Sequence, residues 1–346
     1  MHPAPSRSGN RIHTFLALLA ILPALPAAPA PRWTPQTSGI AARLRGVSAV
    51  NARVAWASGA QGTILRTADR GQTWQRLTIP GTAQLDFRDI DAVGEHTAYA
   101  LSIGPGEASR IYKTSDAGAT WTLQFTNHDP KAFYDALTFW SPTHGIAISD
   151  SVQGRFVVLL TRDGGATWTP IAPGRLPAAL PGEGAFAASG TNIAVHGKRH
   201  VWIGTGAGRV LHSADGGSQW QAAHTGLATS PTAGIFSIAF RNARHGLVVG
   251  GDYKQEAQAL DNASLTEDGG RSWRLVKGLS GFRSVIAWLN SATAIAIGPS
   301  GSDLSRDGGR TWAPVSGPGF HALSAVPHAK VGWGVGEGGR IALLRW

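Results

Sequence analysis

Three arginines occupy matching positions of a repeated pattern and could bind an anion together. Arg45, Arg88 and Arg283 each open a short apolar segment that is predicted to be a strand. The planar fork of a guanidinium group pairs well with a carboxylate or a phosphate. We therefore expect these three arginines to converge on one site for an anion or for an acidic partner.

Other polar residues are predicted to lie on the same face as the arginines. They belong to loops between strands, where binding residues are most often found. The full set of candidate binding residues is Arg45, Arg88, Arg283, Tyr134, Asp135, Asp150, Arg155, Glu183, Asp252 and Tyr253. No catalytic residue is predicted.

Two motifs that resemble ligand sites are better explained as turns. Gly204, Gly206 and Gly208 lie between two predicted strands, whereas a dinucleotide fingerprint joins a strand to a helix. His196 and His200 have a spacing that suits a metal on a helix, but a predicted turn separates them. We therefore expect no cofactor and no metal.

A motif with the pattern Ser/Thr-x-Asp-x-Gly-x-Ser/Thr-Trp occurs six times and is predicted to form a turn. Glycine supplies a positive φ, and the aspartate accepts hydrogen bonds from nearby backbone amides. A catalytic group is not normally repeated in every unit of a fold, so we interpret these aspartates as structural. They are Asp69, Asp116, Asp163, Asp215, Asp268 and Asp307. Gln219 replaces the second hydroxyl residue in the fourth copy.

The spacing of the motif predicts the architecture. Successive motif tryptophans are 47, 47, 52, 53 and 39 residues apart, which is the period of a four-stranded propeller blade. Seven segments read as the second strand of a blade, near Val54, Ala98, Ile146, Trp202, Leu247, Ala294 and Trp333. Residues 31–346 are therefore predicted to be a single all-β domain, a seven-bladed propeller of antiparallel blades.

The two ends of the domain are predicted to pair. There are six motifs for seven blades, and Trp33 reads as the start of the strand that would follow a seventh motif. We expect this amino-terminal strand to complete the last blade, close the ring and remove its exposed sheet edges.

The first 30 residues have the pattern of an export signal. Arg7 and Arg11 precede a short apolar run and then small residues, so residues 1–30 are predicted to be a cleaved signal peptide. The protein is accordingly expected in the periplasm or outside the cell. The chain has no cysteine, so no disulfide or thiol chemistry is expected.

The chain is basic, with a formal net charge of +10. The excess is scattered, and an exported chain is not expected to meet nucleic acid. The charge instead favours acidic protein surfaces, anionic lipid at a membrane surface or envelope polysaccharide. We expect a monomer that binds a protein partner of the cell envelope or an anionic ligand.

The repeated motif resembles the Asp-box, or BNR, repeat. From about Trp33 to Trp346 the chain is similar to the exported propellers of the photosystem II assembly and stability factor family, through Leu85-Asp-Phe-Arg-Asp89, Phe133-Tyr-Asp135 and the Gly-Gly-Arg340 ending. This resemblance implies a seven-bladed, non-catalytic scaffold that binds an assembling membrane protein.

Two enzyme classes are alternatives. Asp-box propellers also resemble sialidases, in which an arginine triad and a tyrosine nucleophile act, and Tyr134 or Tyr253 would take the nucleophile's place. The Phe-Arg-Ile-Pro opening of sialidases is absent, and sialidases have six blades. Xyloglucan-degrading propellers have seven blades but use two such domains. An oxidoreductase is the second alternative, although the sequence contains no haem or flavin motif.

Overall fold

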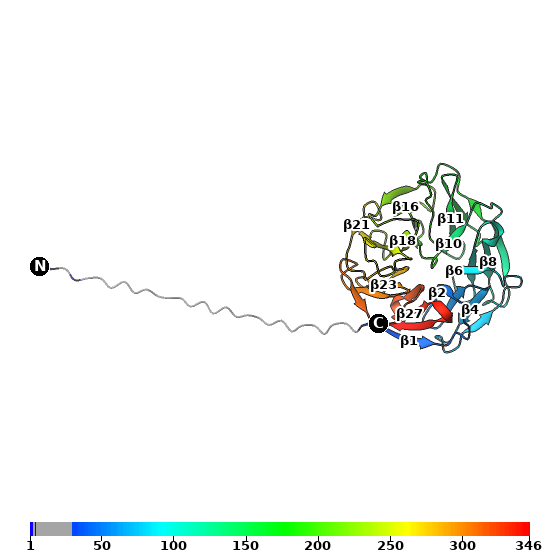
Figure 1. The fold of residues 1–346 in the computed structure, drawn as a ribbon, viewed down its shortest axis with the longest axis horizontal. Coiled ribbons are helices and arrows are strands. Elements are labelled where there is room, and N and C mark those ends of the chain that lie inside the picture. The colour runs from blue at the N-terminus through cyan, green and yellow to red at the C-terminus, as the bar shows by residue number, and fades with distance from the viewer. Residues whose placement is uncertain (3, 5–29) are drawn as a thin grey trace. The chain divides into compact units, whose positions relative to one another are not determined.

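Seven four-stranded antiparallel sheets are arranged round a central axis in the computed structural model, as Figure 1 shows. The model describes Met1, His2, Ala4 and residues 30–346, and the predicted export signal falls mainly outside these residues. Residues 31–346 form one compact unit. Each of the seven segments predicted as a second strand lies at or beside such a strand, which confirms the seven-bladed propeller.

Within a blade the strands follow the chain from the centre of the ring outwards. Blade 1 contains β2 (Leu44–Ala49), β3 (Ala55–Gly59), β4 (Thr63–Thr67) and β5 (Gln75–Leu77). Blade 2 contains β6 (Asp86–Ala92), β7 (Ala98–Ile103), β8 (Arg110–Thr114) and β9 (Thr122–Thr126). Blade 3 contains β10 (Tyr134–Phe139), β11 (Gly145–Val152), β12 (Arg155–Thr161) and β13 (Thr169–Pro170). Blade 4 contains β14 (Ile193–His196), β15 (His200–Gly204), β16 (Arg209–Ser213) and β17 (Gln221–His224).

The remaining blades repeat this order, except that the last one takes its outer strand from the start of the domain. Blade 5 contains β18 (Ala233–Phe240), β19 (Gly246–Asp252), β20 (Ala263–Thr266) and β21 (Arg274–Leu275). Blade 6 contains β22 (Val285–Trp288), β23 (Ala294–Gly298), β24 (Gly301–Ser305) and β25 (Ala313–Val315). Blade 7 contains β26 (Ala322–Val326), β27 (Val331–Val335), β28 (Ile341–Arg345) and β1 (Arg32–Gln36). Short 3-10 turns lie at Gly106–Ala108, Pro327–Ala329 and Glu337–Gly339. Among the described residues, no helix has the length and the apolar composition that a membrane span requires.

Pairing of β1 with β28 closes the ring. Their register runs from Arg32 opposite Arg345 to Gln36 opposite Ile341, and β1 lies beside the carboxy-terminal strands in Figure 1. Gln36 also reaches blade 1, because its Nε2 donates to the carbonyl of Arg70 at 2.8 Å and its Oε1 accepts from Trp74 Nε1 at 3.1 Å. The prediction that the amino-terminal strand completes the last blade is therefore confirmed.

The apolar core of the described residues is divided among the seven blade interfaces. Each interface has its own cluster of buried side chains. The second strands supply the largest of them, including the fully buried Trp56, Trp202 and Trp333. Because a blade alone would expose both of its faces, these clusters form only when neighbouring blades pack together.

Side chains of one innermost strand hydrogen-bond to the free backbone edge of the next. Ser324 Oγ accepts from Ala49 N at 3.0 Å, and Ser48 Oγ accepts from Ala92 N at 3.0 Å. Asp89 Oδ2 accepts from the backbone of β10 at Leu137 N, at 2.7 Å. These bonds matter because an unpaired buried amide costs free energy comparable to a lost hydrogen bond.

The six repeated motifs form turns with one hydrogen-bond pattern. Thr67 Oγ1 donates to Asp69 Oδ1 at 2.8 Å, Thr73 Oγ1 donates to Asp69 Oδ2 at 2.6 Å, and Gly71 N donates to Thr67 Oγ1 at 2.8 Å. The hydroxyl and then the amide of Thr73 lower the pKa of Asp69 to about 2. Threonine bonds of the same kind hold the pKa of Asp116 and Asp163 at about 2. These aspartates are placed as turn acceptors.

The fourth turn shows what the missing hydroxyl contributes. Gln219 donates its backbone N to Asp215 Oδ1 at 2.9 Å and has no hydroxyl to donate to Oδ2. The pKa of Asp215 is still lowered, although burial opposes the hydrogen bonds there. The two kinds of turn therefore differ by one side-chain donor.

Exchanging this donor should move the aspartate pKa in opposite directions. Gln219→Thr is expected to lower the pKa of Asp215, because the new hydroxyl reaches Oδ2. Thr120→Val is expected to raise the pKa of Asp116 towards its ordinary value, because the largest stabilising bond to the carboxylate is lost. Titration of the carboxyl carbons by NMR measures both shifts. Unchanged pKa values in both variants would refute this account.

Candidate functional site

The two ends of the ring are built from different connections. In blades 1 to 6 an amide of the aspartate turn donates to a carbonyl of the turn between the first two strands, as in Arg70 N to Arg53 O at 2.9 Å and Gly216 N to Arg199 O at 2.8 Å. These turns share one end of the ring, which we call the turn face. The opposite end, the loop face, carries the connections between blades and the loops between second and third strands.

Four β-bulges lie at the same point of the innermost strands, close to the loop face. The extra residues are Arg45 in β2, Arg88 in β6, Asp135 in β10 and Phe236 in β18. A bulge re-aims the side chain that it carries. Asp135 is therefore the equivalent of the two arginines in blade 3, and the neighbouring Tyr134 is not.

An arginine cluster, formed by Arg43, Arg45 and Arg88, lies at this point of the ring. Asp86 Oδ2 accepts from Arg88 Nε at 3.0 Å and lies 3.6 Å from Arg43 Nη2. Arg88 Nη1 also donates to the carbonyl of Ala187 at 2.9 Å. One carboxylate therefore serves two of the three guanidinium groups.

Arg45 has no such partner. No hydrogen bond or ion pair of its side chain is found among the described residues, and its Nε is buried without an acceptor. Burial, followed by repulsion from Arg88 and Arg43, lowers the pKa of Arg45 to about 10. The group remains charged at neutral pH. Because its Nε has no acceptor, this side chain is free to bind an anion.

His321 borders the cluster without adding to its charge. Burial and the charge of Arg45 lower the pKa of His321 to about 4, so its ring is neutral at pH 7. Its Nε2 lies 3.2 Å from Glu337 Oε2, and the Glu337 side chain is 67% exposed. The three arginines therefore face two carboxylates, those of Asp86 and Glu337.

A segment from the connection before blade 4, residues 184–191, crosses the ring. It reaches blade 2 through the Arg88 bond to Ala187, and blade 6 through Ser189 Oγ, which donates to Ser284 O at 3.0 Å. Ala185 N donates to Asp150 Oδ1 of blade 3 at 2.8 Å. Because blades 2 and 6 lie on opposite sides of the ring, this crossing segment spans the loop face.

Carboxyl groups line the side of the crossing segment next to blades 2 and 3. Burial, with a contribution from Asp150, raises the pKa of Asp135 well above its ordinary value. Burial also raises the pKa of Asp150 and raises that of Asp89 to about 7. A Cβ at Gly190 would lie 2.0 Å from Asp89 Oδ1, so only glycine permits this approach.

Aromatic side chains support the other side of the crossing segment. Phe186 stacks on Phe236 with ring centroids 4.0 Å apart, and Phe282 packs edge-on against Phe236 at 4.7 Å. Tyr253 meets this cluster edge-on and is 43% exposed. A pocket of about 610 Å³ opens beside Phe186 and Asp150. The crossing segment is thus held by packing as well as by hydrogen bonds.

Two of the predicted site residues serve the fold. Arg283 is 2% exposed and donates from Nε to the buried Asp303 Oδ2 at 2.7 Å, so it does not join the arginine cluster. Glu183 is 3% exposed and is paired with Arg209, while Thr205 Oγ1 donates to its Oε1 at 2.6 Å. Each ion pair neutralises a buried charge, which would otherwise lower the stability of the fold.

The remaining predicted residues are dispersed. Tyr134 is 2% exposed, and burial raises its pKa. Asp252 accepts from Lys254 N at 2.9 Å at the end of β19, and Arg155 lies exposed at the start of β12. These residues share the loop face but do not form one site with Arg45.

The described residues contain no group of three side chains suited to a metal ion. His196 and His200 are cross-strand partners at the β14–β15 turn. Gly204 ends β15, and Gly206 and Gly208 lie in the connection between β15 and β16. None of these positions has the helical setting that the corresponding ligand motif requires.

Arg43 and Asp86 were missed by the sequence analysis. Each lies two residues before a bulge, Arg43 before Arg45 and Asp86 before Arg88. Alignment of the two blades places them at equivalent positions, so this spacing was the available signal. Their contribution depends on a contact between blades, which no local pattern reveals.

No protein-family model matches the chain. A stretch of 161 residues is 29% identical to a xyloglucanase of a Paenibacillus species and covers 38% of this chain and 15% of the enzyme. A stretch of 245 residues is 22% identical to the chloroplastic photosystem II stability/assembly factor HCF136 of Arabidopsis thaliana and covers 57% and 59% of the two chains. These matches span less than two thirds of either relative.

Solved structures share the fold. YCF48 bound to a D1 peptide superimposes with a TM-score of 0.64 at 16% identity, over 93% of this chain and 99% of that chain. The GH74 xyloglucanase of Xanthomonas campestris gives a TM-score of 0.59 at 14% identity, over 90% of this chain and 53% of the enzyme. Both likenesses concern the propeller architecture.

The two kinds of arginine should respond differently to removal. Arg283→Ala is expected to lower the free energy of unfolding by about 3–5 kcal/mol, because Asp303 would remain buried and unpaired. Arg45→Ala should lower it by much less, because no hydrogen bond or ion pair of Arg45 is lost and repulsion from Arg88 and Arg43 is relieved. Urea denaturation at pH 7 measures both values. Equal destabilisation by the two changes would contradict these assignments.

The raised pKa of Asp89 predicts a pH dependence of stability. The fold favours the protonated carboxyl, so this contribution is complete below about pH 4 and is lost as the pH rises through about 7. Asp89→Asn keeps an acceptor for Leu137 N and does not ionise. We expect this variant to lose less stability than the wild type between pH 5 and pH 8, as measured by urea denaturation. The exposed Asp129→Asn is the control, and identical pH profiles for all three proteins would refute the prediction.

Proposed function

We propose that the protein is a non-catalytic scaffold that binds an acidic segment of a protein partner at the arginine cluster. Arg45 is the observation that carries this proposal. Its charged side chain is largely withdrawn from water and has no acceptor among the described residues. A carboxylate at this point would accept charge-assisted hydrogen bonds and would offset the repulsion among the three arginines.

The relatives support a protein as the partner. YCF48, which shares the fold, was solved with a D1 peptide, and HCF136 bears the name of a stability and assembly factor. On this basis we propose that the chain assists the assembly or stability of a complex in a membrane or cell envelope. The pattern of residues 1–30 supports a place of action in the periplasm or outside the cell.

Glycoside hydrolysis is supported by the xyloglucanase matches, but the candidate residues favour binding. Tyr134 is buried, and Asp135 is 1% exposed, so neither is open to a sugar. Tyr253 is exposed, yet its ring contacts Phe186 and Phe236 and no carboxylate contact of its hydroxyl is found among the described residues. A glycosidase requires two carboxyl groups, or a tyrosine with an acid, that flank the scissile bond.

Loss of Arg45 should abolish anion binding and leave the fold intact. Citrate, a soluble tricarboxylate, is expected to raise the melting temperature of the wild type, because a ligand of the folded state stabilises it by about 2.7 kcal/mol at 100 times its Kd. Arg45→Gln should remove this shift and weaken binding of an acidic peptide at least tenfold. Differential scanning fluorimetry and fluorescence anisotropy provide the two measurements.

Arg53→Gln is the matched control, because Arg53 is exposed on the turn face and the change removes the same charge. It should bind citrate and peptide as the wild type does. If both variants lose affinity equally, the effect arises from net charge and the arginine cluster is not the site.

A further inference from the structure

The outer edge of β12 in blade 3 is only partly covered. β13 pairs with β12 at two positions, Leu159 opposite Pro170 and Leu160 opposite Thr169. Ile171 N then donates to Val158 O at 2.8 Å, and the chain leaves the sheet. β12 begins at Arg155. Arg155 and Phe156 pair with β11, Val157 lies at a register shift of that pairing, and none of the three pairs with a strand on the other side.

The chain that leaves the sheet returns to the same hairpin as an arch, residues 171–179. Ala179 N donates to Gly154 O at 3.0 Å at the tip of the hairpin. Arg209 Nη2 donates to Ala178 O at 3.0 Å, and Arg209 is itself held by Glu183. The arch is therefore anchored at both ends and holds the strand edge open.

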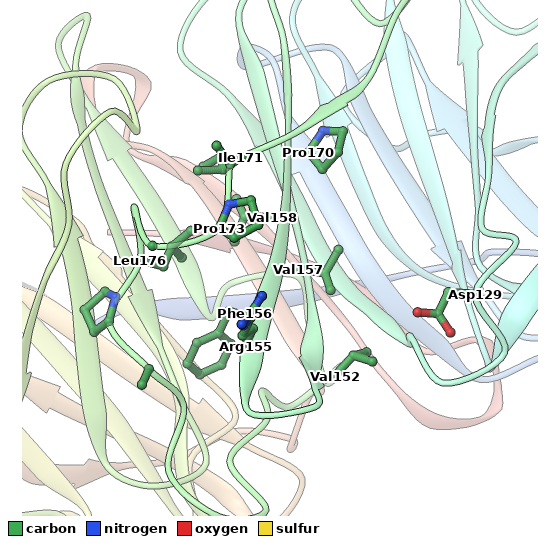
Figure 2. A pocket seen from close by; sticks show the side chains of 14 residues that line it. Asp129, Val152, Arg155, Phe156, Val157, Val158, Pro170, Ile171, Pro173 and Leu176 are labelled. Atoms are coloured by element: carbon green, nitrogen blue, oxygen red, sulfur yellow. The ribbon is translucent and has the colours of Figure 1, made fainter.

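A cavity of about 840 Å³ lies along this edge. The described side chains around it are mostly apolar and stand on both sides of the hairpin in Figure 2. Phe156, Val158 and Leu176 lie on one side, and Val152, Val157 and Pro170 lie on the other. This is the arrangement that an added strand requires, because its successive side chains point to opposite faces.

We propose that this edge is a docking slot for an extended segment of a protein partner, which adds to blade 3 beside Arg155, Phe156 and Val157. The carbonyls of Val158 and Gly154 already accept from the arch, and the backbone groups of the edge between them are open to an extended main chain. Apolar side chains at alternate positions of the segment fill the two sides of the cavity.

Charge decides what kind of segment fits. Arg155 is exposed at the open end of the slot, and Arg175 is exposed on the arch, whereas the acidic lining residue is Asp129. The chain as a whole carries a net charge of +10, which disfavours pairing with a second copy of itself. The occupant is therefore an apolar segment with an acidic residue opposite Arg155. The slot lies on the rim of blade 3, apart from the arginine cluster, and does not depend on that site.

Selection from a phage-displayed library of random twelve-residue peptides tests the slot. Selected peptides should show apolar residues at every second position and an acidic residue at one end. Methylation of alternate backbone nitrogens should weaken binding at least tenfold in one register and less than twofold in the other, since only one edge of a strand faces β12. Peptides without the alternating pattern, or equal affinity in both registers, would overturn the proposal.

Val157→Lys is the variant, because Val157 is half-buried beside the slot. Val315→Lys is its matched control, since Val315 is a half-buried residue of β25, the outer strand of blade 6. Val157→Lys should weaken binding of the selected peptides at least tenfold. Val315→Lys and Arg45→Gln should bind these peptides with affinities within twofold of the wild type. Equal loss in both lysine variants would overturn the slot. A dimer in sedimentation velocity that Val157→Lys dissociates would assign the edge to a second copy instead.

Discussion

Pairing of β1 with β28 closes the ring, and the packing of the blades relies on this closure. Each blade is a twisted sheet with two apolar faces, and it can bury them only against its neighbours. Seven interfaces exist because the first strand of the domain pairs with the last, over five residue pairs from Arg32 to Gln36. Without that pairing, blades 1 and 7 would each expose a face, and the long edge of β28 would be free to pair with another chain.

The inner edge of the ring creates a second demand, which is met by polar side chains. The innermost strand of each blade has a blade on one side and the channel on the other, so its inward amides need acceptors. Ser48, Ser324 and Asp89 supply them for neighbouring blades. Burial of Asp89 for this purpose raises its pKa to about 7. The raised pKa of this carboxyl is a consequence of blade packing, so a raised pKa alone does not mark a catalytic acid.

The crossing segment lies on the loop face, the candidate binding face, which is opposite the turn face. Its hydrogen bonds to Arg88, Asp150 and Ser284 connect the crossing segment to three blades. The segment therefore spans the loop face between the surrounding loops. On the loop face, the Nε of Arg45 has no acceptor among the described residues, whereas Arg283 and Glu183 each form a buried ion pair. The proposed function follows from this difference: the guanidinium of Arg283 has a carboxylate partner within the fold, and that of Arg45 has none among the described residues.

The architecture could be predicted from the sequence, because the signals for it are local and periodic. The aspartate turns recur at blade spacing, and their threonine and glycine neighbours specify the turn wherever it occurs. Trp33 indicated the seam for the same reason.

Which charged side chains are available for binding depends on tertiary contacts. Asp303 lies 20 residues from Arg283, Arg209 lies 26 from Glu183, and Ala187 lies 99 from Arg88. The bulge in β10 makes Asp135, and not Tyr134, the equivalent of Arg45 and Arg88, which a strand alignment with strict alternation cannot foresee. Local patterns fix turns and strand order, but the fate of a charged side chain depends on partners that folding brings from elsewhere in the chain.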